Sequence, residues 1–430
     1  MKKKTVFVGL SGGVDSAVSA TLLKKATPNN FEKLFGRPTP KGFRGYDVVG
    51  VFIKTWHPDF LLCNEEEERH DAMRVAAFLD IPFLTFDFEN VYKKEVADYM
   101  INEYKIGRTP NPDVMCNKEV KFGAFLKKAL AMGADYVATG HYAISNSGLV
   151  VFGSLSPRAR GALPLGPSAC ETPKNNKPAI CLLKGIDPSK DQSYFLWTLR
   201  QEQLKRILFP VGQMKKTEVR KLAKKFNLPV AKKKDSQGIC FLGDVDLKEF
   251  LKHYIKEKRG KVVNEKGETI GYHHGAVFYT LGERHGFTVT KKSSNDGPYY
   301  IVVKDVKKNI LIVSQDRNLK NFPAFALGVI GQGTHGSLNS SNSCLELRGV
   351  NWISEVPKSN KTYTAQIRYH GEFLPCKVRC QRVPLTSVSK GLFDISTTAE
   401  IVFQKPVLVA SGQSCVIYDK DICLGGGVVA

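Results

Sequence analysis

The sequence lacks any stretch able to cross a membrane, because no run approaches the roughly 20 uninterrupted apolar residues that a span requires. It also lacks a C-x-x-C pair, since its ten cysteines are scattered and Cys376 and Cys380 have no second pair nearby. A structural zinc site is therefore not expected. The apolar run after the basic start breaks at glycines, unlike that of a secretory leader. We expect a cytoplasmic protein with no membrane partner and mostly reduced thiols.

Acidic residues are scarce relative to basic ones. The chain has 63 Lys and Arg against 41 Asp and Glu, a net charge of +22, and an isoelectric point near 9.5. Such an excess favours a polyanionic partner, with nucleic acid ahead of an anionic membrane. A lysine-rich surface that serves only solubility gives the same composition. The 430 residues are too many for one ordinary core, so two or three domains are expected.

Strand-like and helix-like segments alternate through the first 140 residues. Apolar runs at 6–10, 48–54, 82–88 and 136–143 are separated by segments with helical periodicity. This order predicts an α/β fold, a doubly wound parallel sheet with helices on both faces. Ligands of such sheets bind beyond the carboxyl ends of the strands, where 11–16 and 139–141 both fall.

The character of the chain changes twice after this region. We predict a catalytic domain over 1–228, a small mixed central domain over 229–290 and a C-terminal β-barrel over 291–430. The barrel prediction rests on brief alternating runs broken by turn residues. Two Pro- and Gly-rich segments, 27–46 and 154–178, have the composition of surface insertions, and neither carries a motif with a known chemical meaning.

The stretch VFVGLSGGVDS places two glycines between a strand and a helix. Gly12 and Gly13 allow the backbone to approach a bound group, and the N–H groups of the following helix favour an anion. No lysine follows the glycines, so this is not a Walker loop, and it is not G-x-G-x-x-G. The hexapeptide SGGVDS resembles the pyrophosphate loop of the ATP-pyrophosphatase superfamily. That resemblance implies ATP binding and adenylation of a substrate, with Asp15 a candidate to place Mg²⁺ on the phosphates.

Two cysteines stand in segments of similar kind. Cys116 follows a Pro-rich turn at the start of a predicted helix, where the helix N-terminus and a neighbouring lysine favour the thiolate. Asp113 is placed to act as a general base or to accept hydrogen bonds from a base edge. Cys240 lies just after a lysine run suited to phosphates. A lone cysteine before a helix is also a common buried filler, so this pattern alone leaves both readings open.

Taken together, the motifs resemble the tRNA-specific 2-thiouridylase family from about residue 5 to the C-terminus, apart from the two insertions. The motifs that carry the resemblance are SGGVDS, GRTPNPDVMCNKEVKF, ATGHYA, KDQSYFLW, FPVGQMKKTEVRKLA, KKKDSQGICFLG and CLGGG. The resemblance implies an adenine-nucleotide alpha-hydrolase-like sheet. It also implies that ATP adenylates the C2 oxygen of the wobble uridine of tRNA. A cysteine persulfide then replaces that oxygen with sulfur, giving 2-thiouridine.

The resemblance also implies a role for individual residues. Cys240 matches the persulfide-bearing position and Cys116 its partner nucleophile, and release of sulfur forms a disulfide between them. The positions that match ATP contacts are Gly9, Leu10, Ser11, Gly12, Gly13, Val14, Asp15, Ser16, Ile53 and Gly140. The positions that match contacts with the target base or the rest of the tRNA are Asn111, Pro112, Asp113, His141, Lys190, Asp191, Gln192, Arg368, Tyr369 and Gln413.

The expected partners are tRNAs of the Lys, Glu and Gln type and a protein persulfide donor, either a cysteine desulfurase or a relay. Without the resemblance, Arg368 and Tyr369 read as an ordinary sheet-surface pair able to contact phosphate and stack on a base. His273 and His274 read as a turn or barrel-edge pair rather than as metal ligands.

One segment departs from the family pattern. YTLGERHGF (279–287) has Glu283 and His285 where Gln and a basic residue are expected, which puts a tRNA contact by this loop in doubt.

Two other functions remain open at this point. Another ATP-pyrophosphatase, such as an amide-forming ligase or a different tRNA modifier, has the same loop but does not need Cys116 and Cys240. A non-catalytic RNA-binding homologue has the fold without the chemistry. The intact loop and both cysteines argue against it, because an inactive homologue gains nothing from them.

Overall fold

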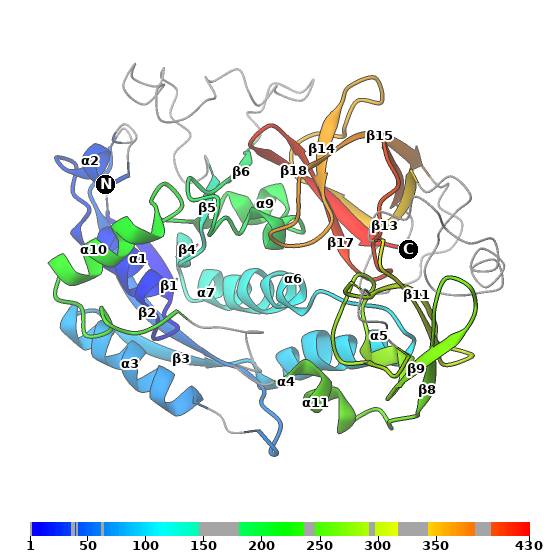
Figure 1. Cartoon of the computed structure of the whole chain (residues 1–430). Helices are drawn as coiled ribbons and strands as arrows, with labels where there is room; N and C mark the ends of the chain where they lie inside the picture. The colour runs from blue at the N-terminus through cyan, green and yellow to red at the C-terminus, as the bar shows by residue number, and fades with distance from the viewer. Residues whose placement is uncertain are drawn as a thin grey trace.

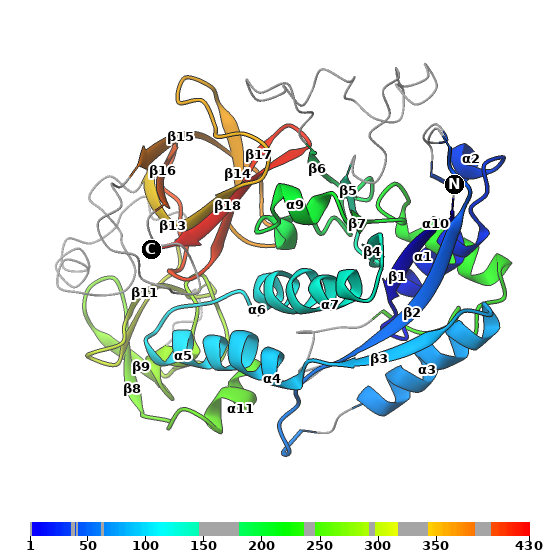
Figure 2. The same cartoon turned by 180° about the vertical axis from the view of Figure 1, so that it is seen from behind.

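The computed structural model describes residues 2–35, 39, 42–61, 64–145, 180–235, 246–291, 297–316, 343–382 and 397–430. These residues form three sheets (Figures 1 and 2). The first sheet lies at one end of the molecule, and two helical runs lead from it toward a mixed sheet and a barrel at the other end. The predicted insertion 154–178 and Cys240 lie outside the described residues.

The first sheet is parallel and has the order β3-β2-β1-β4-β7. Alternate side chains of its central strand enter different cores, as the pleat requires. Val6 and Val8 pack in one cluster and Phe7 in another on the opposite face. The predicted doubly wound sheet is therefore confirmed. Its strands are β1 (Lys4–Gly9), β2 (Tyr46–Lys54), β3 (Phe83–Asp87), β4 (Tyr136–Ala138) and β7 (Ile207–Leu208).

Helices cover both faces of this sheet. The cluster that contains Val6 also holds buried residues of α1 (Val14–Lys25), α2 (Phe31–Phe35), α3 (Glu65–Phe78) and α10 (Lys216–Lys225). The Phe7 cluster holds two longer helical runs. Their segments are α4 (Glu89–Tyr92), η1 (Lys93–Asp98), α5 (Tyr99–Lys105), α6 (Pro112–Met115), η2 (Cys116–Phe125) and α7 (Leu126–Ala131). Two short helices, η3 (Ser193–Leu196) and α9 (Gln201–Leu204), follow in the chain.

The second sheet is mixed and has the order β10-β9-β8-β12-β11, in which β8 and β12 pair in parallel. It is accompanied by α11 (Leu247–Lys252) and η4 (Ala276–Phe278). Its last two strands lie within the region predicted as 291–430, yet they hydrogen-bond to this sheet. The strands are β8 (Gly260–Val263), β9 (Thr269–His273), β10 (Thr288–Val289), β11 (Tyr300–Asp305) and β12 (Ile310–Ser314).

The third sheet closes into an antiparallel barrel because β13 pairs with both β16 and β18. The predicted C-terminal β-barrel is thus confirmed. The sheet continues into the first domain, since β18 also pairs with β6 (Leu182–Lys184), which pairs with β5 (Ala143–Ser145). Within the described ranges, no helix is long and apolar enough to cross a membrane. The barrel strands are β13 (Cys344–Trp352), β14 (Tyr363–Gln366), β15 (Leu374–Arg382), β16 (Thr397–Phe403), β17 (Ser414–Asp419) and β18 (Ile422–Val429).

Candidate active site

The glycine loop joins the end of β1 to the start of α1. Gly12 has a φ of +70°, and a Cβ at this position would lie 2.4 Å from the carbonyl oxygen of Glu68. Only glycine fits such a position. Gly13 is the N-cap residue of α1, and no side chain caps the helix there. The N–H groups of the first helical turn are therefore left for an anion, which the helix dipole also favours.

The segment after β4 touches this first turn. A Cβ on Gly140 would lie 2.8 Å from the backbone nitrogen of Ser16 and 2.9 Å from the carbonyl carbon of Asp15. Within the loop, the Ser16 hydroxyl donates to the Gly13 carbonyl at 3.1 Å. Residues 9–16, Ile53 near the end of β2, and Gly140 beyond β4 therefore gather at the carboxyl edge of the parallel sheet. The expected nucleotide-contact positions are thus close in space.

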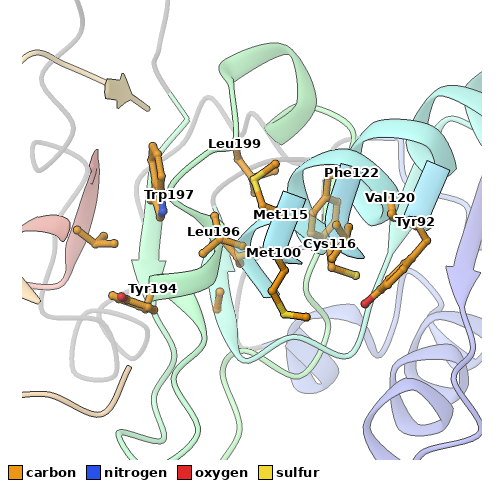
Figure 3. Packing of buried hydrophobic residues seen from close by; sticks show 14 of the residues in the cluster. Tyr92, Met100, Met115, Cys116, Val120, Phe122, Tyr194, Leu196, Trp197 and Leu199 are labelled. Carbon is orange, nitrogen blue, oxygen red and sulfur yellow. The ribbon is translucent and has the colours of Figure 1, made fainter. Parts of the chain in front are cut away.

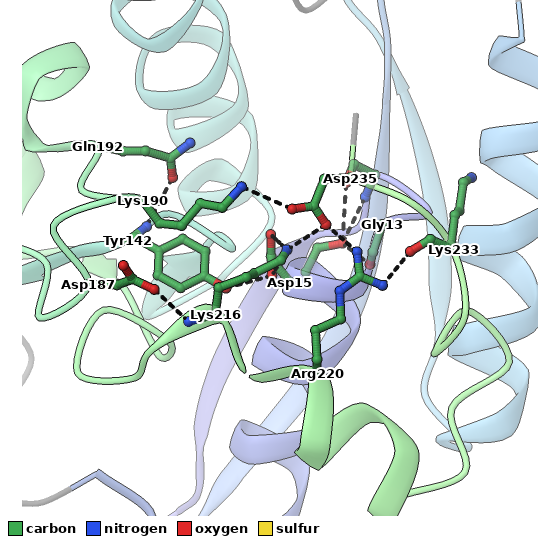
Figure 4. Close-up of polar contacts among 12 residues, drawn as sticks. Gly13, Asp15, Tyr142, Asp187, Lys190, Gln192, Lys216, Arg220, Lys233 and Asp235 are labelled. Atoms are coloured by element: carbon green, nitrogen blue, oxygen red, sulfur yellow. Dashed lines mark hydrogen bonds and ion pairs between the residues drawn. The ribbon is translucent and has the colours of Figure 1, made fainter. Parts of the chain in front are cut away.

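A cluster of charged side chains faces the start of α1 (Figure 4). The Asp15 carboxylate accepts hydrogen bonds from the Lys216 ammonium, 2.8 Å from each oxygen, and from the Tyr142 hydroxyl at 2.8 Å. Lys216 is the first residue of α10, and its backbone N–H donates to Asp187 at 2.9 Å. Burial, followed by the negative charge of Asp15, raises the pKa of Tyr142 above its ordinary value, so this phenol stays protonated.

Asp235 is the second carboxylate of the cluster. It accepts hydrogen bonds from Lys190 at 3.0 Å and from Arg220, and it forms an ion pair with Lys216 at 2.9 Å. Desolvation opposes ionisation of this carboxyl, but hydrogen bonds from the surrounding cations outweigh it and lower its pKa. Asp235 is the last described residue before the segment 236–245, which contains Cys240.

The tripeptide 190–192 is largely engaged within the protein. The Asp191 carboxylate accepts the backbone N–H groups of Gly185 and Ser193 and the Ser193 hydroxyl. Burial raises the pKa of Asp191. The Gln192 side-chain oxygen accepts the Tyr142 backbone N–H at 3.0 Å. These contacts fix the loop, and Tyr142 connects it to Asp15 at the start of α1.

The segment that leads to Cys116 is a short capped helix. Asn111 is the N-cap residue of α6, and its side-chain oxygen accepts the Val114 backbone N–H at 3.2 Å. Pro112 occupies the first helical position, where its missing N–H costs no hydrogen bond. Asp113 is half-buried in the first turn. The local sequence Asn-Pro-Asp thus starts the helix and presents a carboxylate and an amide at its N-terminal end.

Cys116 lies at the start of η2 and is only 3% exposed. It packs in the apolar cluster that also contains Met100, Met115 and Val120 (Figure 3). The thiol is therefore shielded from solvent in this conformation. Its sequence-predicted partner, Cys240, lies outside the described residues.

The barrel contacts this same segment. The Gln413 side-chain amide donates to the Thr109 carbonyl at 3.0 Å, and the Thr109 backbone N–H donates to the Ser411 carbonyl at 2.8 Å. The Thr109 hydroxyl also lies 3.2 Å from that of Thr280, in the region of the central sheet. Residues from all three predicted regions therefore meet at Thr109, two residues before Asn111.

The barrel also supplies an aromatic side chain near Asp113. The ring of Tyr369 packs on Phe195, with 4.4 Å between ring centroids. Burial, together with the nearby Asp191 and Asp113 carboxylates, raises the pKa of Tyr369 to about 12. The neighbouring Arg368 is exposed. The structure therefore brings Tyr369 close to Asp113.

His141 is placed differently from the exposed tRNA-contact candidates. It is 8% exposed, its Nδ1 lies 2.8 Å from the Thr139 hydroxyl, and its ring packs between Phe122 and Phe209. Burial and the nearby Lys121 lower its pKa, so the ring is neutral. A tRNA contact by this side chain stays a prediction.

Glu283, the departure from the family pattern, has a partner within the protein. Its carboxylate pairs with the Lys248 ammonium at 2.5 Å and accepts the Thr280 backbone N–H at 3.0 Å. The side chains of Arg284 and His285 are exposed. The acidic residue therefore holds the 279–287 loop in place, and the two exposed basic groups are the ones that face solvent.

Sequence reasoning assigned no role to Lys216, Arg220, Tyr142 or Asp235. Lys216 and Arg220 lie in a quoted motif, but nothing in their local pattern shows that they face a loop some 200 residues earlier. The spacing of a lysine and an arginine at i and i+4 on one helix was the available signal, because such residues share a face.

Family models for three domains match the chain. They are the tRNA methyl transferase HUP domain over residues 42–244, the tRNA methyl transferase PRC-barrel domain over 248–315 and the aminomethyltransferase beta-barrel domain over 342–429. The chain is 39% identical over 428 residues to the tRNA-specific 2-thiouridylase MnmA of Listeria monocytogenes serotype 4b, covering 99% of this chain and 94% of that protein. It is 40% identical over 434 residues to the tRNA-specific 2-thiouridylase MnmA 1 of Geobacillus kaustophilus, covering 100% and 96%. Among solved structures, the U34-tRNA thiolase NcsA of Methanococcus maripaludis is 14% identical with a TM-score of 0.30, covering 55% of this chain and 60% of that one, a likeness too low to carry an argument.

Proposed function

The chain belongs to the tRNA-specific 2-thiouridylase family, and from this premise we propose how its residues replace the C2 oxygen of a wobble uridine with sulfur. The observation that carries the proposal is the identity of 39–40% to named 2-thiouridylases over almost the whole chain. The uncapped glycine loop and its surrounding cations support the first half-reaction. In that step the C2 oxygen attacks the α-phosphorus of ATP, and pyrophosphate leaves.

ATP is the substrate expected at the glycine loop. The first-turn N–H groups of α1 and the close approach of Gly140 suit a phosphate group. Residues 9–16 and Ile53 are proposed to line the rest of the nucleotide site. We propose that Mg²⁺ accompanies the phosphates, where Asp15 would help to hold it and the ion would neutralise phosphate charge. The described residues contain no group of three or more His, Cys, Asp or Glu side chains that could hold a metal ion.

The second half-reaction uses the two cysteines. The terminal sulfur of a Cys240 persulfide attacks C2 of the adenylated uridine and forms a C–S bond. The C2–O bond then breaks, and the oxygen leaves as part of AMP. The Cys116 thiolate then attacks the Cys240 sulfur, which breaks the S–S bond to the base and leaves 2-thiouridine and a Cys116–Cys240 disulfide. A thiol reductant restores both thiols, and a protein persulfide donor, a desulfurase or a relay, reloads Cys240.

The burial of Cys116 makes a rearrangement part of this proposal. A disulfide requires Cα atoms within roughly 7 Å and a thiolate in line with the S–S bond. Because Cys116 is only 3% exposed, we propose that its segment moves between adenylation and sulfur transfer. Asp113, at the start of α6, is proposed to hold the base edge or accept a proton, together with Asn111 and Pro112.

The tRNA is proposed to lie across the catalytic domain and the barrel. Lys190 and Gln192 bind Asp235 and Tyr142 beside the glycine loop, and the Tyr369 ring of the barrel packs on Phe195, three residues after Gln192. Phosphate contact and stacking on a flipped base are the chemistry these groups suit. Asp191, His141 and Gln413 are also proposed to contact tRNA from the resemblance, though their side chains make the internal contacts described above. We propose a cytoplasmic enzyme that acts on tRNAs of the Lys, Glu and Gln type.

The test uses the full chain with unmodified tRNA, Mg-ATP, a persulfide donor and a thiol reductant, followed by nucleoside analysis by mass spectrometry. We expect 2-thiouridine at the wobble position with the wild type and with Cys380→Ser, an exposed barrel cysteine that serves as the control. Cys116→Ser and Cys240→Ser are each expected to form no product. Full activity in either variant refutes the two-thiol mechanism, and thiolation at another nucleotide refutes the substrate.

A further inference from the structure

The feature that the proposed function leaves unexplained is a half-buried ammonium group in front of the glycine loop. The Lys216 side chain is 13% exposed, although lysine side chains are ordinarily exposed. Its Nζ lies 2.8 Å from both oxygens of Asp15 and 2.9 Å from Asp235 (Figure 4). One cation is thus shared by two carboxylates.

The position of this ammonium is set by three separate elements. Its backbone lies at the start of α10, where Asp187 accepts the Lys216 N–H. The ring of Tyr142 lies beneath it, with 5.9 Å from Nζ to the ring centroid, and the Tyr142 hydroxyl donates to the same Asp15. An ammonium held by this many contacts is oriented before any ligand arrives, which lowers the entropic cost of using it.

The glycine loop itself has no cation. A Walker loop supplies a lysine directly after its glycines, whereas Gly13 here is followed by Val14 and Asp15. Asp15 lies in the first turn of α1, where the phosphate is proposed to bind. Its negative charge repels that of the phosphate. A cation bound to Asp15 offsets that repulsion and adds attraction of its own.

We propose that Lys216 is the phosphate-binding cation of the nucleotide site and that Asp235 is the positioning residue that holds it. This inference rests on the proposed function, since it takes ATP to be the ligand of the glycine loop. Lys216 contacts the phosphate chain and neutralises charge as pyrophosphate leaves. Lys190, and Arg220 on the same helix as Lys216, also bind Asp235 and hold it in place. Two independent observations carry the proposal. The glycine loop contains no lysine, and Lys216 makes short contacts with Asp15, the second residue of α1.

The test compares four full-length variants in the ATP dependence of pyrophosphate release with unmodified tRNA. They are Lys216→Met, Lys216→Arg, Asp235→Asn and the control Lys221→Met, an exposed lysine on the same helix. We expect kcat/KM for ATP to fall about 10- to 100-fold in Lys216→Met, the range for a lost charge-assisted contact, and to recover in large part in Lys216→Arg. Asp235→Asn is expected to raise KM for ATP more than it lowers kcat. Lys221→Met is expected to match the wild type.

A purely structural role is separated by a second measurement, the tRNA dissociation constant, which Lys216→Met leaves within about twofold of wild type if only phosphate binding is lost. Equal kcat/KM values in Lys216→Met and Lys221→Met overturn the proposal, as does a loss of tRNA affinity as large as the loss in kcat/KM. The equilibrium affinity for Mg-ATP separates the two proposals. If the wild type binds ATP but makes no 2-thiouridine, the proposed function fails, whereas weaker ATP binding by Lys216→Met still supports this inference.

Discussion

Replacing Gly140 by alanine tests the close contact between the segment after β4 and the glycine loop. The added Cβ would lie 2.8 Å from the Ser16 nitrogen, whereas ordinary contacts begin near 3.4 Å, so one backbone must move by about 0.6 Å. Both neighbours are backbone atoms in the first turn of a helix and cannot rotate away. Overpacking of this kind costs about 1–3 kcal/mol in the free energy of unfolding. Any shift also displaces the N–H groups proposed to hold phosphate.

The matched control is Gly9→Ala, at the other side of the same loop. Its Cβ would meet its nearest atoms at 3.8 Å, an ordinary contact, so we expect a change in the free energy of unfolding of less than about 0.5 kcal/mol. Urea denaturation of both variants measures this difference, and the KM for ATP of Gly140→Ala measures the displacement of the loop. A Gly140→Ala protein with wild-type stability and wild-type KM for ATP would show that the contact is not as tight as described.

Three further predictions address the barrel, a buried histidine and the surface charge. Gln413→Ala removes the hydrogen bond to the Thr109 carbonyl and is expected to lower the thiolation rate while KM for ATP stays unchanged, a split visible in steady-state kinetics. His273 accepts the Gly275 N–H through Nδ1, and burial lowers its pKa to about 4, below the ordinary 6.5. The unfolded chain therefore binds more protons between these values, so the free energy of unfolding falls by up to about 3 kcal/mol as pH drops from about 6.5 to about 4. Urea denaturation across that range checks the slope, and His273→Gln should flatten it. Finally, the net charge of +22 predicts that tRNA affinity drops at least about tenfold between about 50 mM and about 200 mM salt, and a flat response in filter binding would count against a basic tRNA surface.

The glycine loop was predictable because its information is local. A short continuous apolar run indicates β1, two glycines allow the turn, and the periodic residues after Val14 indicate α1, as the structure confirms. The parallel sheet followed from the same kind of evidence repeated along the chain. The cluster around Asp15 was not predictable in this way. Its partners Tyr142 and Lys216 come from segments far along the chain, and only tertiary packing sets which lysine of a basic helix turns inward.

In the barrel, too, the strands could be predicted from the sequence, but not all of their pairing partners. Short alternating runs predicted its strands, and the structure confirms a closed antiparallel sheet. That β5 and β6 would extend this sheet was not foreseen, since three-residue strands carry almost no periodicity of their own. Their conformation is decided by the partner strand β18.

The ladder between β6 and β18 has a consequence for the order of folding. Leu182 and Leu183 pair with Cys423 and Ile422, so β6 cannot complete its pairing until a strand roughly 240 residues later in the chain has been synthesised. During synthesis the parallel sheet can form early, but β5 and β6 present an unpaired edge until β18 arrives. Completion of the barrel and burial of that edge are therefore the same late event. A chain interrupted before β18 would expose the edge beside the Lys190–Gln192 loop and would be prone to aggregate rather than to act as a shorter enzyme.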